Sequence, residues 1–358
     1  MNIDFHYGVI YIVARIAGLD VPAATTVAHA CQYIDDSTVD GVLYFSGGES
    51  YSRVASAHSL FDYQNVFAAR DKLVWVPFHF LPGGEGETLE DKSVCRPNSL
   101  IAQAMVREGI RDPHAENALH RLGVTLHVYI DTWAHQGFSG TISKHNQVHN
   151  LSSHHIDTNS WLTQLESFTE DVSNRIKSET IDHLERLGHG AALHLPDLPW
   201  ANWQYTNGHG LKIERDNLPQ FIEAADMAHR VVRGFLRGNA NFMEEEGLPE
   251  SIKHALEELL GSNRDENANN RLHSVMSAVA SGAIPMLREP VPEYIAKGVG
   301  SWKYQATGIT SDKDDGPTKP AWSEKFESSD YRKFHDAVKE HLFMVTQTVL
   351  PAHGVRLV

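Results

Sequence analysis

Apolar residues recur at helical spacing along most of this chain, and the pattern predicts helices throughout its length. The first two predicted helices span residues 8–18 and 23–36, and the proline of the intervening Leu-Asp-Val-Pro suits a helix start. We expect these two helices to form a hairpin. Further helices are predicted for residues 99–107, 114–135, 161–187, 219–236, 251–260, 271–280 and 329–349.

Stretches without the helical period separate these helices. Residues 39–53 are rich in Gly and Ser with short apolar strips, and residues 73–81 predict an extended segment that ends at Pro-Gly-Gly. Polar or irregular loops are expected at residues 82–97, 139–159 and 298–320. The chain contains no internal repeat and no long Gly, Ser or Pro linker that would separate independent domains.

The pattern therefore predicts an all-α fold, a single large helical domain with long irregular loops. Within this domain we expect residues 1–240 to form a metal-binding helical region, on the evidence of the polar residues described next. Residues 241–358 are expected to form a C-terminal helical extension that packs on it.

The helix predicted over residues 114–135 carries His127, Asp131 and His135 at steps of four residues. Each such step rotates by about 40° around a helix, so the three side chains lie along one face within two turns. The residues between them are apolar around nearly the whole circumference, which indicates a buried helix. Buried His and Asp need partners, so we interpret the three residues as metal ligands rather than as a hydrogen-bonded core cluster.

Four further positions are weaker candidates when each is considered alone. His79 is a single polar residue in an apolar strip, where a hydrogen-bonded core histidine is the commoner case. Asp35 and Asp36 end a predicted helix, where acids interact unfavourably with the helix dipole unless a cation compensates. Either carboxylate could bind such a cation while the other orients or deprotonates a water molecule. His6 precedes the first helix in an otherwise aromatic and apolar segment.

Later in the chain, His189 lies between two glycines and Asp197 follows in a Pro-rich segment. Glycines on both sides permit close approach of the backbone, although an ordinary helix end followed by a polar turn explains the pattern equally well. The remaining histidines of the polar loops are interpreted as solvated, namely His145, His149, His154, His155 and His209. The chain shows neither a Gly-rich phosphate loop nor a serine nucleophile elbow.

The composition narrows the classes of function. Hydrophobic residues make up 41% and charged residues 22%, as in average globular proteins. The formal net charge of −15 repels phosphate backbones, so no nucleic-acid partner is expected. Histidine is unusually frequent, with 22 residues, whereas only Cys31 and Cys95 represent cysteine. Any metal would therefore be bound by nitrogen and oxygen atoms.

The N-terminal segment carries an acid and a histidine where a secretory signal has basic residues. No run approaches the roughly 20 apolar residues of a membrane span. From these two observations we expect a cytoplasmic protein without a transmembrane segment, and signal-independent export stays open. The oligomeric state does not follow from the sequence.

Taken in chain order, these motifs resemble those of the zinc-dependent phospholipase C and S1/P1 nuclease superfamily. The central segment Leu-Gly-x3-His-x3-Asp-x3-His is similar to that of the glycosylphosphatidylinositol-specific phospholipase D branch. The opening Asp-Phe-His-Tyr-Gly, the Cys-Gln-Tyr-Ile-Asp-Asp segment and the Gly-His-Gly turn look like an uncharacterised bacterial family of that kind. The resemblance covers residues 4–205.

The resemblance implies an all-helical protein with a cluster of two or three zinc ions. Asp131 would bridge two ions, His79 and His127 would bind one of them, and the other would be bound by His135, His189 and Asp197. The resemblance also places His6, Asp35 and Asp36 among the metal ligands.

The residues and the resemblance together predict a metal-dependent phosphoesterase that acts on a phospholipid or small phosphate ester. A metal-activated water held near Asp35 or Asp36 would attack the ester. Two alternatives stay open: another helical metalloenzyme, such as an HD-type phosphohydrolase or a di-iron oxidoreductase, and a non-catalytic, metal-stabilised binding or toxin-like module.

Overall fold

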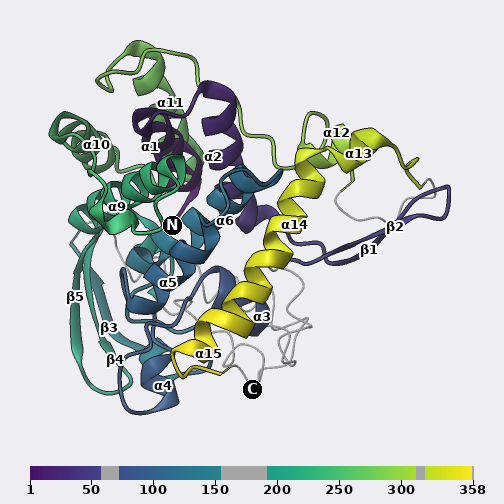
Figure 1. The fold of residues 1–358 in the computed structure, drawn as a ribbon. Coiled ribbons are helices and arrows are strands. Elements are labelled where there is room, and N and C mark those ends of the chain that lie inside the picture. The colour runs from purple at the N-terminus through teal and green to yellow at the C-terminus, as the bar shows by residue number, and fades with distance from the viewer. Residues whose placement is uncertain (58–71, 155–191, 312–318, 357–358) are drawn as a thin grey trace, which may run out of the picture.

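The computed structural model describes residues 1–57, 72–154, 192–311 and 319–356. Its central element is helix α6 (Ala118–Ala134), which packs mainly against four other helices. Figure 1 shows α6 surrounded by helices from both ends of the chain. The four are α2 (Val21–Asp36), α5 (Leu100–Gly109), α9 (Asn217–Arg237) and α14 (Asp330–Phe343).

Helix α6 is buried at every position from Leu122 to Ala134, as its nearly continuous apolar surface predicts. Gly123 allows its close approach to α2. A Cβ atom at this position would lie 2.5 Å from the carbonyl oxygen of Val27 and 2.6 Å from the Cβ of Ala30. The absence of a side chain at Gly123 therefore brings the C-terminal half of α2, which carries Asp35, against the face of α6 that carries His127.

The predicted N-terminal hairpin is confirmed. It consists of a π-helical segment η1 (Asp4–Val9), helix α1 (Ile10–Ala17) and α2. Gly18 ends α1 in a left-handed conformation with φ of 115°, and the Asp20 side chain accepts a hydrogen bond from the amide of Ala23 to begin α2. The hairpin places His6 and Asp35 on neighbouring segments.

The prediction of an all-α fold is wrong, because the chain also forms two small antiparallel sheets. The first pairs β1 (Gly41–Tyr44) with β2 (Ser50–Arg53). The second has the order β3-β4-β5, formed by β3 (Val148–Ser153), β4 (Asn202–Asn207) and β5 (Lys212–Asp216). Burial alternates along β4, with every second residue facing the core. This period of two is the strand signal that the helical interpretation overlooked.

Three of the predicted non-helical stretches contain helix. Residues 73–81 were expected to be extended, but α3 (Lys72–Phe78) is helical and carries a proline in its last turn. The loop expected at 82–97 contains the short α4 (Leu89–Lys92), and the irregular region at 298–320 contains α12 (Trp302–Thr307). The predicted helix at 161–187 lies outside the described residues.

The C-terminal part of the chain is helical as predicted. It contains α10 (Glu250–Ser262), α11 (Ala268–Ser281), α13 (Glu324–Glu327) and α14, which continues through η7 (Met344–Val349) into α15 (Leu350–Ala352). One large cluster of buried apolar residues extends from Met1 to Val355. Among the described residues, no helix is both long and apolar enough to cross a membrane.

Candidate metal centre

Helix α6 presents His127 and Asp131 one turn apart, and His135 follows as the residue that caps its C-terminus. The amide of His135 donates to the carbonyl of Asp131 at 2.9 Å, so the helical geometry extends to the third residue. All three side chains are buried, and only 1% of the surface of Asp131 is exposed. The predicted alignment on one face is therefore present.

Three histidines of the site each bind a backbone carbonyl oxygen with one ring nitrogen. His127 Nδ1 lies 2.8 Å from the carbonyl oxygen of Cys31, and His79 Nε2 lies 2.8 Å from that of Ser56. His135 Nδ1 lies 2.7 Å from the carbonyl oxygen of His79. A carbonyl oxygen only accepts, so each of these nitrogens carries a proton. In a neutral ring the opposite nitrogen then carries the lone pair, the arrangement typical of metal-binding histidines.

The lone-pair nitrogens of His127 and His79 face one another, and the carboxylates of Asp35 and Asp131 lie beside them. His127 Nε2 lies 3.3 Å from His79 Nδ1 and 3.3 Å from Asp131 Oδ2. Asp35 Oδ1 lies 3.7 Å from the His127 nitrogen and 3.8 Å from the His79 nitrogen. Donor atoms in a tetrahedral zinc site with bonds of about 2.0–2.2 Å lie about 3.3–3.6 Å apart. Asp35, His79 and His127 thus offer ligand atoms within 4.8 Å of one another, near the spacing that one shared cation requires, and His6, His127 and Asp131 form a second such group.

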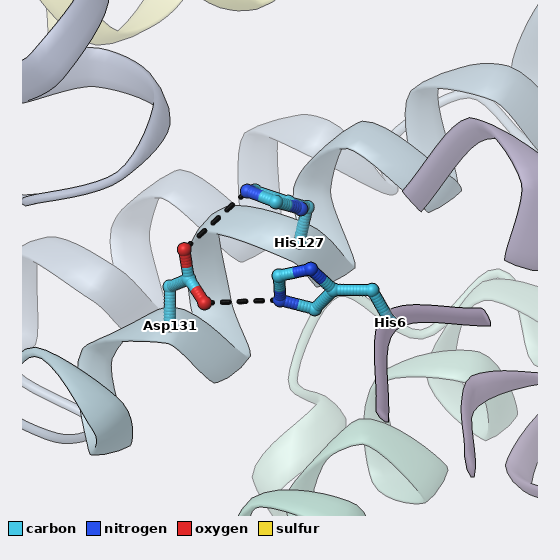
Figure 2. A group of neighbouring side chains, drawn as sticks. All are labelled: His6, His127 and Asp131. Carbon is cyan, nitrogen blue, oxygen red and sulfur yellow. Dashed lines mark hydrogen bonds and ion pairs between the residues drawn. The ribbon is translucent and has the colours of Figure 1, made fainter. Parts of the chain in front are cut away.

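The second oxygen of Asp131 faces a different set of groups. Asp131 Oδ1 lies 3.0 Å from His6 Nε2 and 2.7 Å from the α-amino nitrogen of Met1, and Figure 2 shows His6 and His127 on opposite oxygens of this carboxylate. The other ring nitrogen of His6, Nδ1, lies 2.9 Å from Asp35 Oδ2. Asp131 thus stands between two groups of polar side chains.

Asp197 adds a third carboxylate beside these groups, from the short helix η5 (Leu195–Asp197). Its Oδ1 lies 3.4 Å from His135 Nε2 and 3.0 Å from the Met1 nitrogen. The ring of His135 stacks on Phe80, with centroids 4.6 Å apart. The structure therefore brings Asp197 to the cluster, whereas His189 lies outside the described residues.

The surroundings determine which of these groups are charged. Burial and the neighbouring His6 lower the pKa of His127 to about 4, so its ring is neutral at pH 7. Burial opposes ionisation of Asp131, but the Met1 amino group and nearby histidines hold the pKa of Asp131 well below its usual range. Burial also opposes ionisation of Asp35, but the rings of His127 and His6, which are protonated at low pH, favour its anion and give it a pKa of about 2. The centre therefore combines carboxylate anions with a neutral imidazole.

Asp36 does not join this cluster. Its Oδ2 accepts hydrogen bonds from Tyr294 Oη at 2.7 Å and from Gln32 Nε2 at 3.1 Å. Successive residues of a helix point about 100° apart, so Asp35 and Asp36 cannot both face α6. Asp35 faces the histidines, and its side chain is 31% exposed. This exposure leaves one side of an otherwise buried centre open to solvent.

A model of a family of unknown function, DUF6765, matches residues 1–349 of the chain. The chain belongs to this family. No curated protein and no solved structure matches the chain. All the site residues predicted for this chain lie within residues 1–349, so the centre belongs to the part of the chain that the family model matches.

Several groups of the centre were not predicted from the sequence. The carbonyl oxygens of Cys31 and Ser56 belong to the main chain, and no side-chain pattern signals them. The α-amino group of Met1 also lies in the centre, where the opposing effect of burial is outweighed by Asp131 and Asp197, which raise its pKa to about 11.

Proposed function

We propose that this protein is a metal-dependent hydrolase of phosphoric esters, with divalent ions, preferably zinc, bound around Asp131. The observation that carries the proposal is the convergence of lone pairs from His127, His79, Asp35 and Asp131 on one space. His127 Nε2 and His79 Nδ1 face each other at 3.3 Å, and in each ring the other nitrogen donates to a carbonyl oxygen. The two lone pairs therefore repel unless a cation or proton lies between them.

The donor atoms favour zinc among the common ions. Imidazole nitrogens and carboxylate oxygens suit Zn²⁺, whereas Mg²⁺ and Ca²⁺ prefer oxygen alone. The cysteines do not compete as ligands, because burial raises the pKa of both Cys31 and Cys95 and keeps the thiols protonated. One ion would be bound by His127, His79, Asp35 and Asp131. A further ion would use the opposite oxygen of Asp131 with His6, and His135 and Asp197 complete the ligand set.

Hydrolysis is favoured over a closed structural site by the exposure of Asp35. A structural zinc site is normally enclosed by its protein ligands, whereas a catalytic site retains a position for water. Asp35 is the partly exposed acid of the centre and is ionised at neutral pH, so it can accept a hydrogen bond from a water molecule and orient it. Bound ions would supply a water of lowered pKa and would stabilise the negative charge that develops on a phosphoryl oxygen. Asp36 is assigned no such role, because Tyr294 and Gln32 occupy its carboxylate.

The proposed substrates are phospholipids or small phosphate esters. The support is chemical, because clustered cations beside the partly exposed carboxylate of Asp35 would attract and bind an anionic ester. Nucleic acid is the less favoured ester, because the chain carries a formal net charge of −15.

The test compares the wild type with Asp131→Asn, purified without added metal and analysed for transition metals by mass spectrometry. We expect the wild type to contain two or three zinc ions in the centre and the variant to lose most of them, because an amide cannot bridge two cations as a carboxylate does. Asp36→Asn is the matched control and should retain the wild-type content, because its carboxylate lies outside the cluster.

The same proteins are then assayed with bis-p-nitrophenyl phosphate and with phosphatidylcholine vesicles. Wild type and Asp36→Asn should hydrolyse at least one of these, and Asp131→Asn should be slower by about 10²-fold or more. A wild type without transition metal, or equal metal content in Asp131→Asn, would refute the metal centre. Bound metal without hydrolysis of either ester would refute the phosphoesterase and favour a binding module.

A further inference from the structure

A second group of metal-ligating side chains lies away from the buried centre and shares no residue with it. Glu90 of α4, His145 of the short helix η3 (Lys144–Asn146) and His209 of the β4–β5 turn offer ligand atoms that all lie within 4.8 Å of one another. His209 Nε2 is 3.8 Å from Glu90 Oε1, and the two imidazole rings have centroids 4.5 Å apart. Figure 1 shows α4 beside the end of the three-stranded sheet.

The carboxylate of this group is held in place by hydrogen bonds. Glu90 Oε1 accepts from the amide of Lys144 at 2.7 Å and from Ser143 Oγ at 2.9 Å. Ser143 Oγ in turn accepts from the amide of His145 at 3.0 Å. Hydrogen bonds of this kind, from groups that are not ligands themselves, orient carboxylates at metal sites. They also fix the backbone of His145 relative to Glu90.

The turn that carries His209 is docked on the same segment. The amide of Gly208 donates to the carbonyl of Lys144 at 3.0 Å, and Asn207 Oδ1 accepts from the amides of His209 and Leu211, each at 3.0 Å. A Cβ atom at position 208 would lie 2.6 Å from the Lys144 carbonyl oxygen, so the glycine permits this contact. The three candidate ligands therefore come from three segments whose backbones are already joined.

We propose that Glu90, His145 and His209 form a second metal site, which takes one divalent transition ion such as Zn²⁺. Two imidazoles and a carboxylate are typical ligands for this class of ion. The side chains are accessible, since His209 is 35% and Glu90 38% exposed, so water completes the coordination. The ion joins the β4–β5 turn to α4. It exchanges more readily than the ions of the buried centre, because its ligands face solvent.

The ion competes with one contact of the metal-free protein. His145 Nε2 lies 3.3 Å from Asp91 Oδ1, an ion pair at the surface when the ring is protonated. Such a pair near the protein surface is weak, so it does not prevent a divalent ion from binding the same imidazole.

The experiment measures bound zinc per chain by equilibrium dialysis of the full-length protein over a range of free zinc concentrations. His145→Ala/His209→Ala should bind one ion fewer than the wild type. His149→Ala/His154→Ala is the matched control, because it removes two exposed histidines of the same region outside the cluster, and it should bind as the wild type does. Equal binding by wild type and His145→Ala/His209→Ala at every zinc concentration would overturn the second site.

Two further variants test whether zinc binds here independently of the buried centre, and whether binding depends on the geometry of the site as well as on its histidines. Asp131→Asn should retain the zinc ion that His145→Ala/His209→Ala loses, and failure to retain it would show that no independent site exists. Gly208→Ala keeps all three ligands but pushes the turn away from Lys144, so its dissociation constant for this ion should rise at least tenfold. If Gly208→Ala binds this zinc ion with unchanged affinity, the contact of the turn with Lys144 does not position the ligands, and the proposal is contradicted.

Discussion

His341 is a buried histidine outside the metal centre whose protonation affects stability. Its ring donates from Nε2 to the carbonyl oxygen of Pro77 at 2.9 Å and stacks on Phe78. Burial lowers its pKa to about 4, from about 6.5 in an unfolded chain. Between these two values the unfolded chain binds a proton that the native protein does not. The contribution of His341 to the free energy of unfolding is therefore fully present above pH 6.5 and is lost as the pH falls toward 4.

We expect His341→Gln, which retains a hydrogen-bond donor, to weaken this acid sensitivity. Urea unfolding at pH 7 and pH 5 measures the effect. The loss of unfolding free energy between pH 7 and pH 5 should be smaller in the variant by about 1–2 kcal/mol. Each pH unit over which only the unfolded chain binds the proton changes this free energy by about 1.4 kcal/mol. His254→Gln is the control, because its side chain is 73% exposed. An identical pH dependence of His341→Gln and wild type would contradict the prediction.

Single residues also show how much of the site the sequence could predict. His127, Asp131 and His135 are predictable because helical spacing alone places them on one face. His79 is not predictable in isolation, because its role depends on the carbonyl of Ser56, which only the fold brings near. His145 and His209 were interpreted as solvated loop residues. No local pattern relates two histidines that meet through a sheet and a turn.

At the scale of elements, the packing of α6 on α2 depends on Gly123. Gly123→Ala would place a methyl group within 2.6 Å of main-chain and side-chain atoms of α2 that have no room to move. We expect a loss of about 1–3 kcal/mol in the free energy of unfolding, measured by urea titration, even though alanine has the higher helix propensity.

Gly261→Ala is the control for this prediction. There the added Cβ would meet the end of the Leu218 side chain, which can rotate away, so the variant should be neutral or slightly stabilised. Equal stability of Gly123→Ala and wild type would show that the two helices can separate without cost.

The sheets and α3 show where prediction of elements fails. Residues 41–53 contain a Gly-Gly pair between two short alternating strips, a hairpin signal that the surrounding helical pattern obscured. In 73–81 the valines, tryptophan and proline suggest an extended segment, yet α3 is helical. Pro77 has no amide to donate to the carbonyl of Leu73, and its ring crowds that carbonyl, so the local sequence opposes this helix. Contacts of α3 with α6 and α14 override the local preference.

For the whole molecule, the buried ion pair between Asp4 and Arg271 joins the N-terminal segment to α11. Arg271 Nε lies 2.7 Å from Asp4 Oδ2, and a second guanidinium nitrogen lies 3.0 Å from Oδ1. The two side chains are only 1–2% exposed. The predicted boundary at residue 240 is thus crossed by a buried pair as well as by the continuous apolar core.

We expect Arg271→Met to lower the free energy of unfolding by about 3–5 kcal/mol, because it leaves the Asp4 carboxylate buried without a counter-charge. Arg111→Met, at an arginine whose side chain is 70% exposed, should change stability by less than about 1 kcal/mol. Thermal and urea unfolding check both values. Similar small losses in the two variants would mean that Asp4 finds another partner or reaches solvent.

Because main-chain carbonyls orient three histidines of the centre, evolution can alter some supporting positions more freely than others. A carbonyl oxygen is present whatever side chain its residue carries, so replacements at Cys31 that respect its buried volume leave the ring of His127 oriented as before. Insertion or deletion of one residue near Ser56, in contrast, moves the carbonyl that orients His79. The centre is therefore tolerant of point substitution at its supporting positions and sensitive to changes in the length of the loop that carries Ser56.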